Sequence, residues 1–147
     1  MAPIRVVAER RIAAPAELVY GQIADMHQHQ AFLPPAFSDF RVEAGGIGAG
    51  SVVSFDVTAG GRSRHYRMVV AEPKPGEVLT ESDSTSSLVT TFTVRPEGDA
   101  CHVRIETRWE GAGGIGGFFE RLFAPAAMRR LYDDELRRLD AHASGRR

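Results

Sequence analysis

The C-terminal segment from Gly113 to Ala143 constrains the fold most, because it has the pattern of one long amphipathic helix. One face of it carries Ile115, Phe118, Phe119 and Leu122, and continues with Met128, Leu131, Tyr132, Glu135, Leu136 and Leu139. Pro125 lacks a backbone donor, so we expect a kink or break near Leu122 to Ala124. A helix with such a stripe needs a concave apolar surface, which the rest of the chain must supply.

The chain begins with a predicted strand and two short helices. The apolar residues of Ile4 to Ile12 suit a buried strand. Pro15 then marks a helix start, and the stripe of that helix consists of Leu18, Val19, Ile23 and Met26. A second short helical turn is expected within Asp25 to Pro35, before an extended exit.

Six further strands are indicated by apolar residues at every second position and by turn residues between them. Inward positions are expected at Phe40 and Val42, at Val53, Phe55 and Val57, at Tyr66, Met68 and Val70, in Val78 to Thr80, at Leu88, Thr90, Phe92 and Val94, and at Val103, Ile105, Thr107 and Trp109. Gly60-Gly61 predicts a hairpin, and Ser82 to Ser87 a polar turn. Opposite the last strand's apolar positions, residues such as Arg104 and Glu106 are expected to face water. The order predicts an α+β fold with one bent antiparallel sheet and helices on one face.

This order and several short motifs resemble the START-like superfamily, also called SRPBCC or Bet v 1-like, in its polyketide cyclase/dehydrase branch. The motifs are Glu9 to Tyr20 (ERRIAAPAELVY), Ile23-Ala24-Asp25, His29, Phe32-Leu33-Pro34, Gly48-Ala49-Gly50 and Leu136 to Leu139. The resemblance implies one START-like domain over residues 1–147 with a helix-grip fold. In that fold about seven strands wrap around the long C-terminal helix and leave an elongated cavity.

The resemblance implies a hydrophobic or aromatic ligand in this cavity. The predicted ligand-binding residues are large inward-facing side chains: Phe32, Phe37, Phe55, Tyr66, Met68, Phe92, Trp109, Phe118, Leu122 and Phe123. Plain core packing is the alternative role for each of them. Tyr66 and Trp109 are the stronger candidates, because a buried hydroxyl or indole N–H needs a partner that a ligand could supply.

Three other motifs are given structural interpretations. Gly111, Gly113 and Gly116 spell G-x-G-x-x-G, but a dinucleotide site needs a parallel strand after the helix, so a hinge is the better reading. His27 and His29 point apart on a helix and are interpreted as solvated, and no metal site is expected. His65 and His102 lie on the polar register of their strands.

Composition limits the partners and the location. The net charge of −1 argues against a nucleic-acid partner, and no segment approaches the roughly 18 apolar residues of a membrane span. Cys101 is alone, and Met1 to Arg11 has no signal-peptide pattern. We therefore expect a cytoplasmic monomer or weak homodimer without a cofactor.

Three functions remain open. The first is the binding of a lipid, polyketide or aromatic metabolite, and the second is a cofactor-free polyketide cyclase or dehydratase on the same scaffold. For catalysis only Tyr66, Trp109, Arg10 or Arg67 could serve, and no acid–base pair is evident, so almost wholly apolar walls favour binding. Regulation through a protein partner is the third.

Overall fold

The computed structural model describes residues 3–59, 62–110 and 125–145. The elements are β1 (Pro3–Ile12), α1 (Ala16–Ala24), α2 (Met26–His29), a short 3-10 helix η1 (Gln30–Phe32), β2 (Phe37–Ala44), β3 (Val52–Ala59), β4 (Arg62–Lys74), β5 (Val78–Asp83), β6 (Val89–Glu97), β7 (Ala100–Glu110) and α4 (Pro125–Ser144). The seven strands form one antiparallel sheet in the order β1-β7-β6-β5-β4-β3-β2. The expected α+β helix-grip architecture is confirmed.

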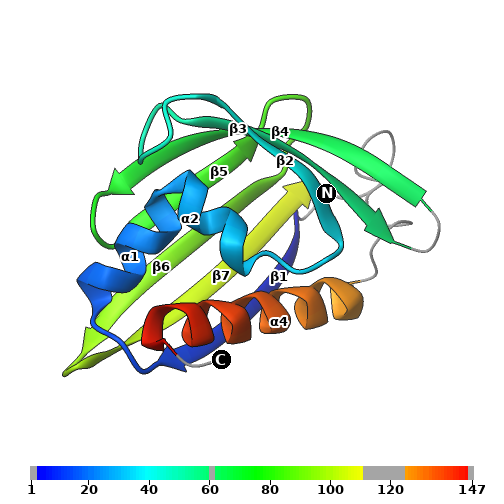
Figure 1. Ribbon diagram of the computed structural model, residues 1–147. Coiled ribbons are helices and arrows are strands. Elements are labelled where there is room, and N and C mark those ends of the chain that lie inside the picture. Colours follow the sequence, from blue (N-terminus) through cyan, green and yellow to red (C-terminus); the bar gives the residue numbers. More distant parts are fainter. Residues whose placement is uncertain (1–2, 60–61, 111–124, 146–147) are drawn as a thin grey trace.

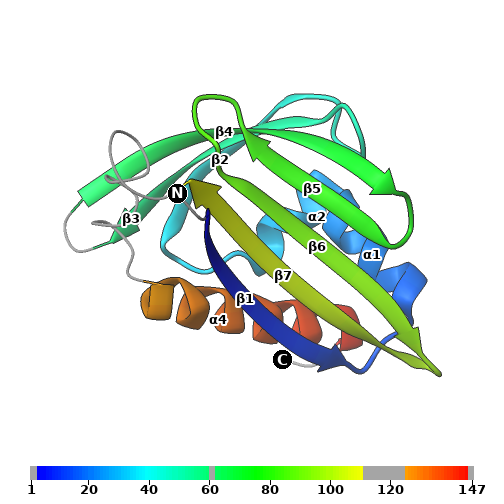
Figure 2. The ribbon, with the colours of Figure 1, turned by 180° about the vertical axis from the view of Figure 1, so that it is seen from behind.

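The described helices all lie on one face of the sheet, as Figure 1 shows, with α4 crossing in front of β7 and β1. From behind, the other face carries strands only, so it is exposed in the described part of the chain (Figure 2). Register shifts interrupt the pairing of β2 with β3 and of β4 with β5. Such bulges bend strands, which curves the sheet around α4.

Alternation along the strands decides which side chains face the helices. The predicted inward positions Val53, Phe55 and Val57 are buried, and so are Val103 and Ile105 on β7. Three neighbouring strands, β5, β6 and β7, pair so that Glu81 lies opposite Thr90 and Thr90 opposite Thr107. A row of polar side chains therefore crosses a concave face that is otherwise mostly apolar.

Several expectations need correction. Leu18 was expected on the buried stripe of α1 but is 46% exposed, whereas Tyr20 is buried. Strand β5 continues to Asp83, so its end is not part of the polar turn, and Glu81 and Asp83 gain inward positions. The described helix begins at Pro125, which suits a first helical position. The expected break near Leu122 to Ala124 lies outside the described residues, as does the Gly60-Gly61 turn.

Glu72 of β4 holds a glycine-rich turn to the first helix. One carboxylate oxygen accepts a hydrogen bond from the Tyr20 hydroxyl at 2.6 Å, and the other accepts one from the backbone N–H of Ala49 at 2.8 Å. Gly48 has a φ of 67°, and a Cβ atom there would lie 2.3 Å from the Glu72 carboxylate. Only glycine fits this turn without displacement.

Candidate functional site

A cavity of about 50 Å³ lies between α4 and the concave face of the sheet. Its apolar walls consist of Leu33, Phe37, Phe40, Phe55, Val57, Met68, Leu88, Phe92, Met128 and Leu131, and its polar groups come from His29, Tyr66, Glu81, Thr90, Tyr132 and Glu135. The aromatic rings are in mutual contact, since the Phe55 ring centroid lies 5.4 Å from that of Phe37 and 5.8 Å from that of Tyr66. The cavity thus has an aromatic region and an acidic group of residues.

Five of the ten predicted ligand-binding residues line this cavity: Phe37, Phe55, Tyr66, Met68 and Phe92. Phe32 and Trp109 are buried but do not line it. Phe32 instead packs on His29, with ring centroids 4.7 Å apart. Phe118, Leu122 and Phe123 lie outside the described residues.

His29, Glu81 and Glu135 meet inside the cavity from three different elements, α2, β5 and α4. The exposed fractions of these residues are 3%, 6% and 2%. The Nε2 atom of His29 lies 4.0 Å from Oε1 of Glu81 and 3.9 Å from Oε2 of Glu135. These three residues, here called the acidic cluster, contradict two expectations: that His29 is solvated, and that the walls are almost wholly apolar with no acid–base group.

The backbone fixes the orientation of the His29 ring. Nδ1 of His29 lies 2.9 Å from the carbonyl oxygen of Ile23. A carbonyl oxygen only accepts hydrogen bonds, so Nδ1 carries a proton and donates it. In the neutral ring, Nε2 is then an unprotonated acceptor that faces both carboxyl groups.

Burial shifts the pKa values of both carboxyl groups of this cluster upward. It raises the pKa of Glu81, although the adjacent His29 lowers it in part. Burial raises the pKa of Glu135 well above its usual value, and the negative charges of Glu81 and Asp134 add to that effect. An apolar surrounding disfavours the charged form, and two carboxylates in one site repel each other. Such groups can hold or transfer protons near neutral pH.

Hydroxyl groups continue the polar row beside the cluster. The Thr90 and Thr107 hydroxyl oxygens lie 2.7 Å apart, and the Thr107 and Tyr132 hydroxyl oxygens 2.6 Å apart. Burial raises the pKa of Tyr132, so its phenol stays protonated. The row joins β6 and β7 to α4 at the level of the acidic cluster.

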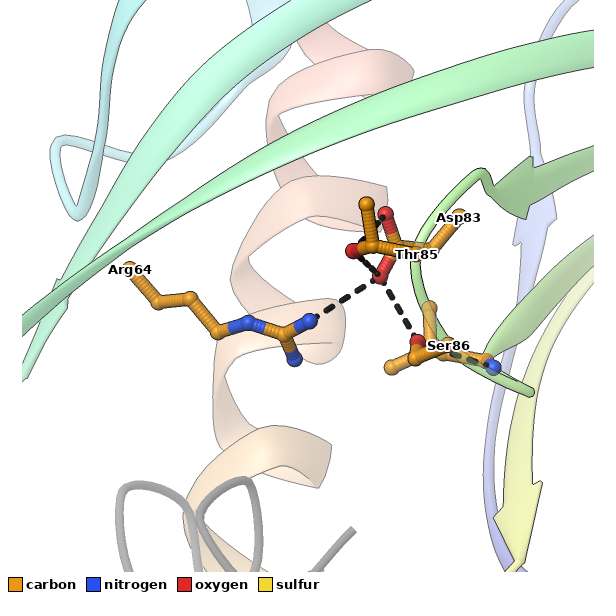
Figure 3. Close-up of polar contacts among 5 residues, drawn as sticks. Arg64, Asp83, Thr85 and Ser86 are labelled. Carbon is orange, nitrogen blue, oxygen red and sulfur yellow. Dashed lines mark hydrogen bonds and ion pairs between the residues drawn. The ribbon is translucent and has the colours of Figure 1, made fainter. Parts of the chain in front are cut away.

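A second polar group lies where β4 and β5 approach the β5–β6 turn. Figure 3 shows the Arg64 guanidinium pointing at Asp83, whose carboxylate also faces Thr85 and Ser86. Nη2 of Arg64 donates to Asp83 at 3.1 Å, and the Ser86 hydroxyl donates at 2.7 Å. The guanidinium carbon also lies 4.5 Å from the centroid of the Tyr66 ring. Asp83 is thus bound by residues of its own turn and by Arg64.

The arginines named as catalytic candidates take structural roles instead. Arg67 lies on the exposed register of β4 and donates to Glu43 at 3.0 Å. Arg10 donates to the buried carboxylate of Asp140 at 3.0 Å, which ties β1 to α4. Arg64 shares the inward register of Tyr66 and Met68, and its partner is Asp83.

The remaining histidines follow the sequence pattern more closely. His65 is exposed, as expected, and its Nδ1 atom lies 2.7 Å from the Asp56 carboxylate. His102 is half-buried beside Glu9. Among residues 3–59, 62–110 and 125–145 no three His, Cys, Asp or Glu side chains are arranged to hold a metal ion. None of the described helices has the length and apolar character needed to cross a membrane.

The sequence did contain a signal for two members of the cluster. Glu135 stands on the apolar stripe of α4, and Glu81 follows Leu79 at an inward strand position. A charged residue on a buried register is unusual and indicates function or pairing. His29 gave no such signal, because its burial depends on where a helix of four residues packs.

Comparisons with known proteins agree with this geometry. Residues 3–144 match the sequence profile of a family described as polyketide cyclase / dehydrase and lipid transport. A search of curated proteins gave no match. Among solved structures, the KanY protein, determined by NMR in solution, is 34% identical, with 99% of this chain and 100% of that chain covered and a TM-score of 0.87.

Two more distant structures share the fold. The Zhui aromatase/cyclase from Streptomyces sp. R1128 is 17% identical, with 97% of this chain and 94% of that chain covered and a TM-score of 0.73. The ginseng major latex-like protein 151 from Panax ginseng is 13% identical, with 96% of this chain and 97% of that chain covered and a TM-score of 0.73. At these identities the likeness concerns the fold.

Proposed function

Because this chain belongs to the polyketide cyclase / dehydrase and lipid transport family, we propose that it binds a hydrophobic small molecule, such as a lipid, polyketide or aromatic metabolite, between the sheet and α4. The observation that carries this proposal is the cavity itself, whose walls include Phe37, Phe40, Phe55 and Phe92. Burying about 300 Å² of apolar ligand surface there would contribute roughly 7 kcal/mol before the costs of association.

The cavity must widen to take a ligand of this kind. About 50 Å³ has room for a few water molecules only. Met68 of the sheet and Met128 of α4 both line the cavity. Methionine side chains change rotamer at low cost, so these two residues are the parts of the wall best suited to move.

Binding of the uncharged fluorescent hydrophobe N-phenylnaphthylamine tests this proposal. We expect saturable fluorescence enhancement with the wild-type protein. Leu131 lines the cavity and is half-buried, so Leu131→Trp should fill the cavity and weaken binding about tenfold or more. Leu18→Trp places the same ring on an exposed site and should bind as the wild type does. No enhancement, or equal weakening by both substitutions, would overturn the proposal.

A cofactor-free cyclase or dehydratase is the second candidate, and the acidic cluster is the observation that favours it. Nε2 of His29 can accept a proton while a neutral carboxyl of Glu81 or Glu135 donates one. Such a pair catalyses enolisation next to a ketone. Deuterium exchange at the α-carbon of benzylacetone, followed by NMR in heavy water, should then exceed the buffer rate and fall to it in His29→Gln. An exchange rate equal to that of buffer removes this candidate.

The same proposal describes a single domain over residues 1–147 that acts in the cytoplasm as a monomer or weak homodimer, without a nucleic-acid partner. The net charge of −1 and the buried Cys101 thiol support this part. Size-exclusion chromatography with light scattering tests the assembly state. A stable higher oligomer would contradict it.

A further inference from the structure

The acidic cluster presents three hydrogen-bond acceptors to one point of the cavity. They are Oε1 of Glu81, Oε2 of Glu135 and Nε2 of His29, and both carboxyl oxygens lie within 4.0 Å of the same ring nitrogen. In the neutral ring this nitrogen is an acceptor, because the Ile23 carbonyl oxygen lies 2.9 Å from Nδ1 and accepts its proton. The three atoms come from separate elements, so the fold rather than one local motif brings them together.

Apart from His29, no described side chain pairs with the two carboxyl groups. Glu81 and Glu135 accept no hydrogen bond from any described residue, and no described arginine or lysine pairs with either. The guanidinium of Arg64, on the inward register of β4, is bound to Asp83. Buried carboxylates without a counter-ion are costly, so they either take up protons or bind a cation.

The geometry points to a ligand that carries a protonated primary amine, whose three N–H donors bind Glu81, Glu135 and His29 while its apolar part lies against the aromatic wall. The inference rests on the proposed function, since it names the chemical class that the same cavity takes. An ammonium group has three donors and no acceptor, which matches a site of three acceptors. Without the ligand, protons on the carboxyl groups balance the charge instead.

A ligand carbonyl is the main alternative occupant, and it predicts the opposite dependence on pH. A carbonyl needs a donor, which the cluster supplies only while its carboxyl groups are protonated, so its binding weakens as pH rises. An ammonium competes with those protons, so its binding strengthens as pH rises through the raised pKa values of Glu81 and Glu135.

Two other titratable groups act on the cluster, and neither reverses this sign. Burial raises the pKa of Tyr132 on α4, so its phenol stays neutral while the two carboxyl groups titrate. Asp134, on the outer side of α4, has a lowered pKa because it accepts hydrogen bonds from Arg138 and Arg137, so its charge is constant. The pH dependence therefore reports on Glu81 and Glu135.

Matched aromatic probes that differ only in the head group test the inference. Phenethylamine, phenethyl alcohol and hydrocinnamate are titrated by protein-observed NMR and calorimetry against the wild type, Glu81→Gln, Glu135→Gln and the exposed control Glu43→Gln. At about pH 8 we expect the amine to bind roughly tenfold more tightly than the alcohol. Each cavity variant should abolish most of this preference and leave binding of the alcohol within about twofold, and Glu43→Gln should match the wild type.

A second measurement needs no substitution, so it holds even if a cavity variant does not fold. Binding of phenethylamine to the wild type near neutral pH should release protons, seen as a heat that differs between phosphate and Tris buffers. Equal affinity for amine and alcohol, or an amine preference that both cavity variants retain, would overturn the amine inference alone. Failure of every probe, including N-phenylnaphthylamine, would overturn the proposed function as well.

Discussion

The hydroxyl oxygen of Tyr132 lies 2.6 Å from that of Thr107, so a hydrogen bond joins the C-terminal helix to strand β7 within the buried interface. Tyr132→Phe removes this bond and leaves Thr107 bonded to Thr90. We expect the free energy of unfolding to fall by about 1 kcal/mol, measured by urea denaturation. A double-mutant cycle with Thr107→Val should show coupling of similar size, and a coupling near zero would contradict the contact.

Glu135 makes stability depend on pH in the direction opposite to that of a salt-bridged carboxylate. Its pKa is raised above the ordinary 4.5 in the folded protein, so between these two values the folded state binds more protons than the unfolded state. Stability therefore falls as pH rises through this window. Glu135→Gln removes the effect, so urea denaturation should show a gain over wild type that is larger at about pH 8 than at about pH 4.

The control for this prediction is Glu17→Gln, which alters an exposed carboxylate on the first turn of α1. Its stability difference from wild type should hardly change with pH. If Glu135→Gln is equally destabilised at every pH, the burial of an uncompensated carboxyl group is refuted.

Loss of the charge on Asp83 should lower the free energy of unfolding far more than loss of the charge on an exposed aspartate. Asp83→Asn leaves the guanidinium of Arg64, whose side chain is only 12% exposed, without its carboxylate partner (Figure 3). We expect a loss of about 2 kcal/mol in unfolding free energy. Asp39→Asn removes an exposed pair with Arg41 and should cost less than about 0.5 kcal/mol. Equal effects would contradict this ranking.

Gly48 and Gly50 separate the cost of a left-handed backbone from the cost of a collision. Both have positive φ, but only at Gly48 would a Cβ atom meet another group, the Glu72 carboxylate at 2.3 Å. Gly48→Ala should therefore lower the free energy of unfolding by about 1 kcal/mol or more beyond the loss in Gly50→Ala. Thermal denaturation should show the lower midpoint for Gly48→Ala. A smaller effect at Gly48 would show that Glu72 moves aside freely.

Most of the fold could be predicted from the sequence because its signals are periodic and local. The alternation of Val53, Phe55 and Val57 identifies the buried side of β3 whatever its neighbours are. Pro125 identifies the start of α4, and the stripe from Met128 to Leu139 identifies its buried side. The structure confirms the helix-grip architecture, and the match of residues 3–144 to the family profile confirms the family.

The acidic cluster could not be predicted, because its three residues lie on separate elements. His29 is buried while His27, two residues earlier, is exposed, and only the packing of α2 against the sheet decides between them. Glu81 lies on strand β5 only because the strand continues to Asp83, three residues beyond the expected Val78 to Thr80. Glu135 stood on the helical stripe, but its partners are supplied by tertiary structure.

The pairing of β1 with β7 has a consequence for synthesis of the protein. Pro3 pairs with Glu110 and Ile12 with Cys101, so β1 has no partner until β7, far along the chain, has been synthesised. Contacts between such distant segments slow folding, and an unpaired strand is open to aggregation while it waits. Neither β7 nor α4 is present in a chain that stops near Glu97, so an unfinished chain lacks the residues of α4 that close the cavity.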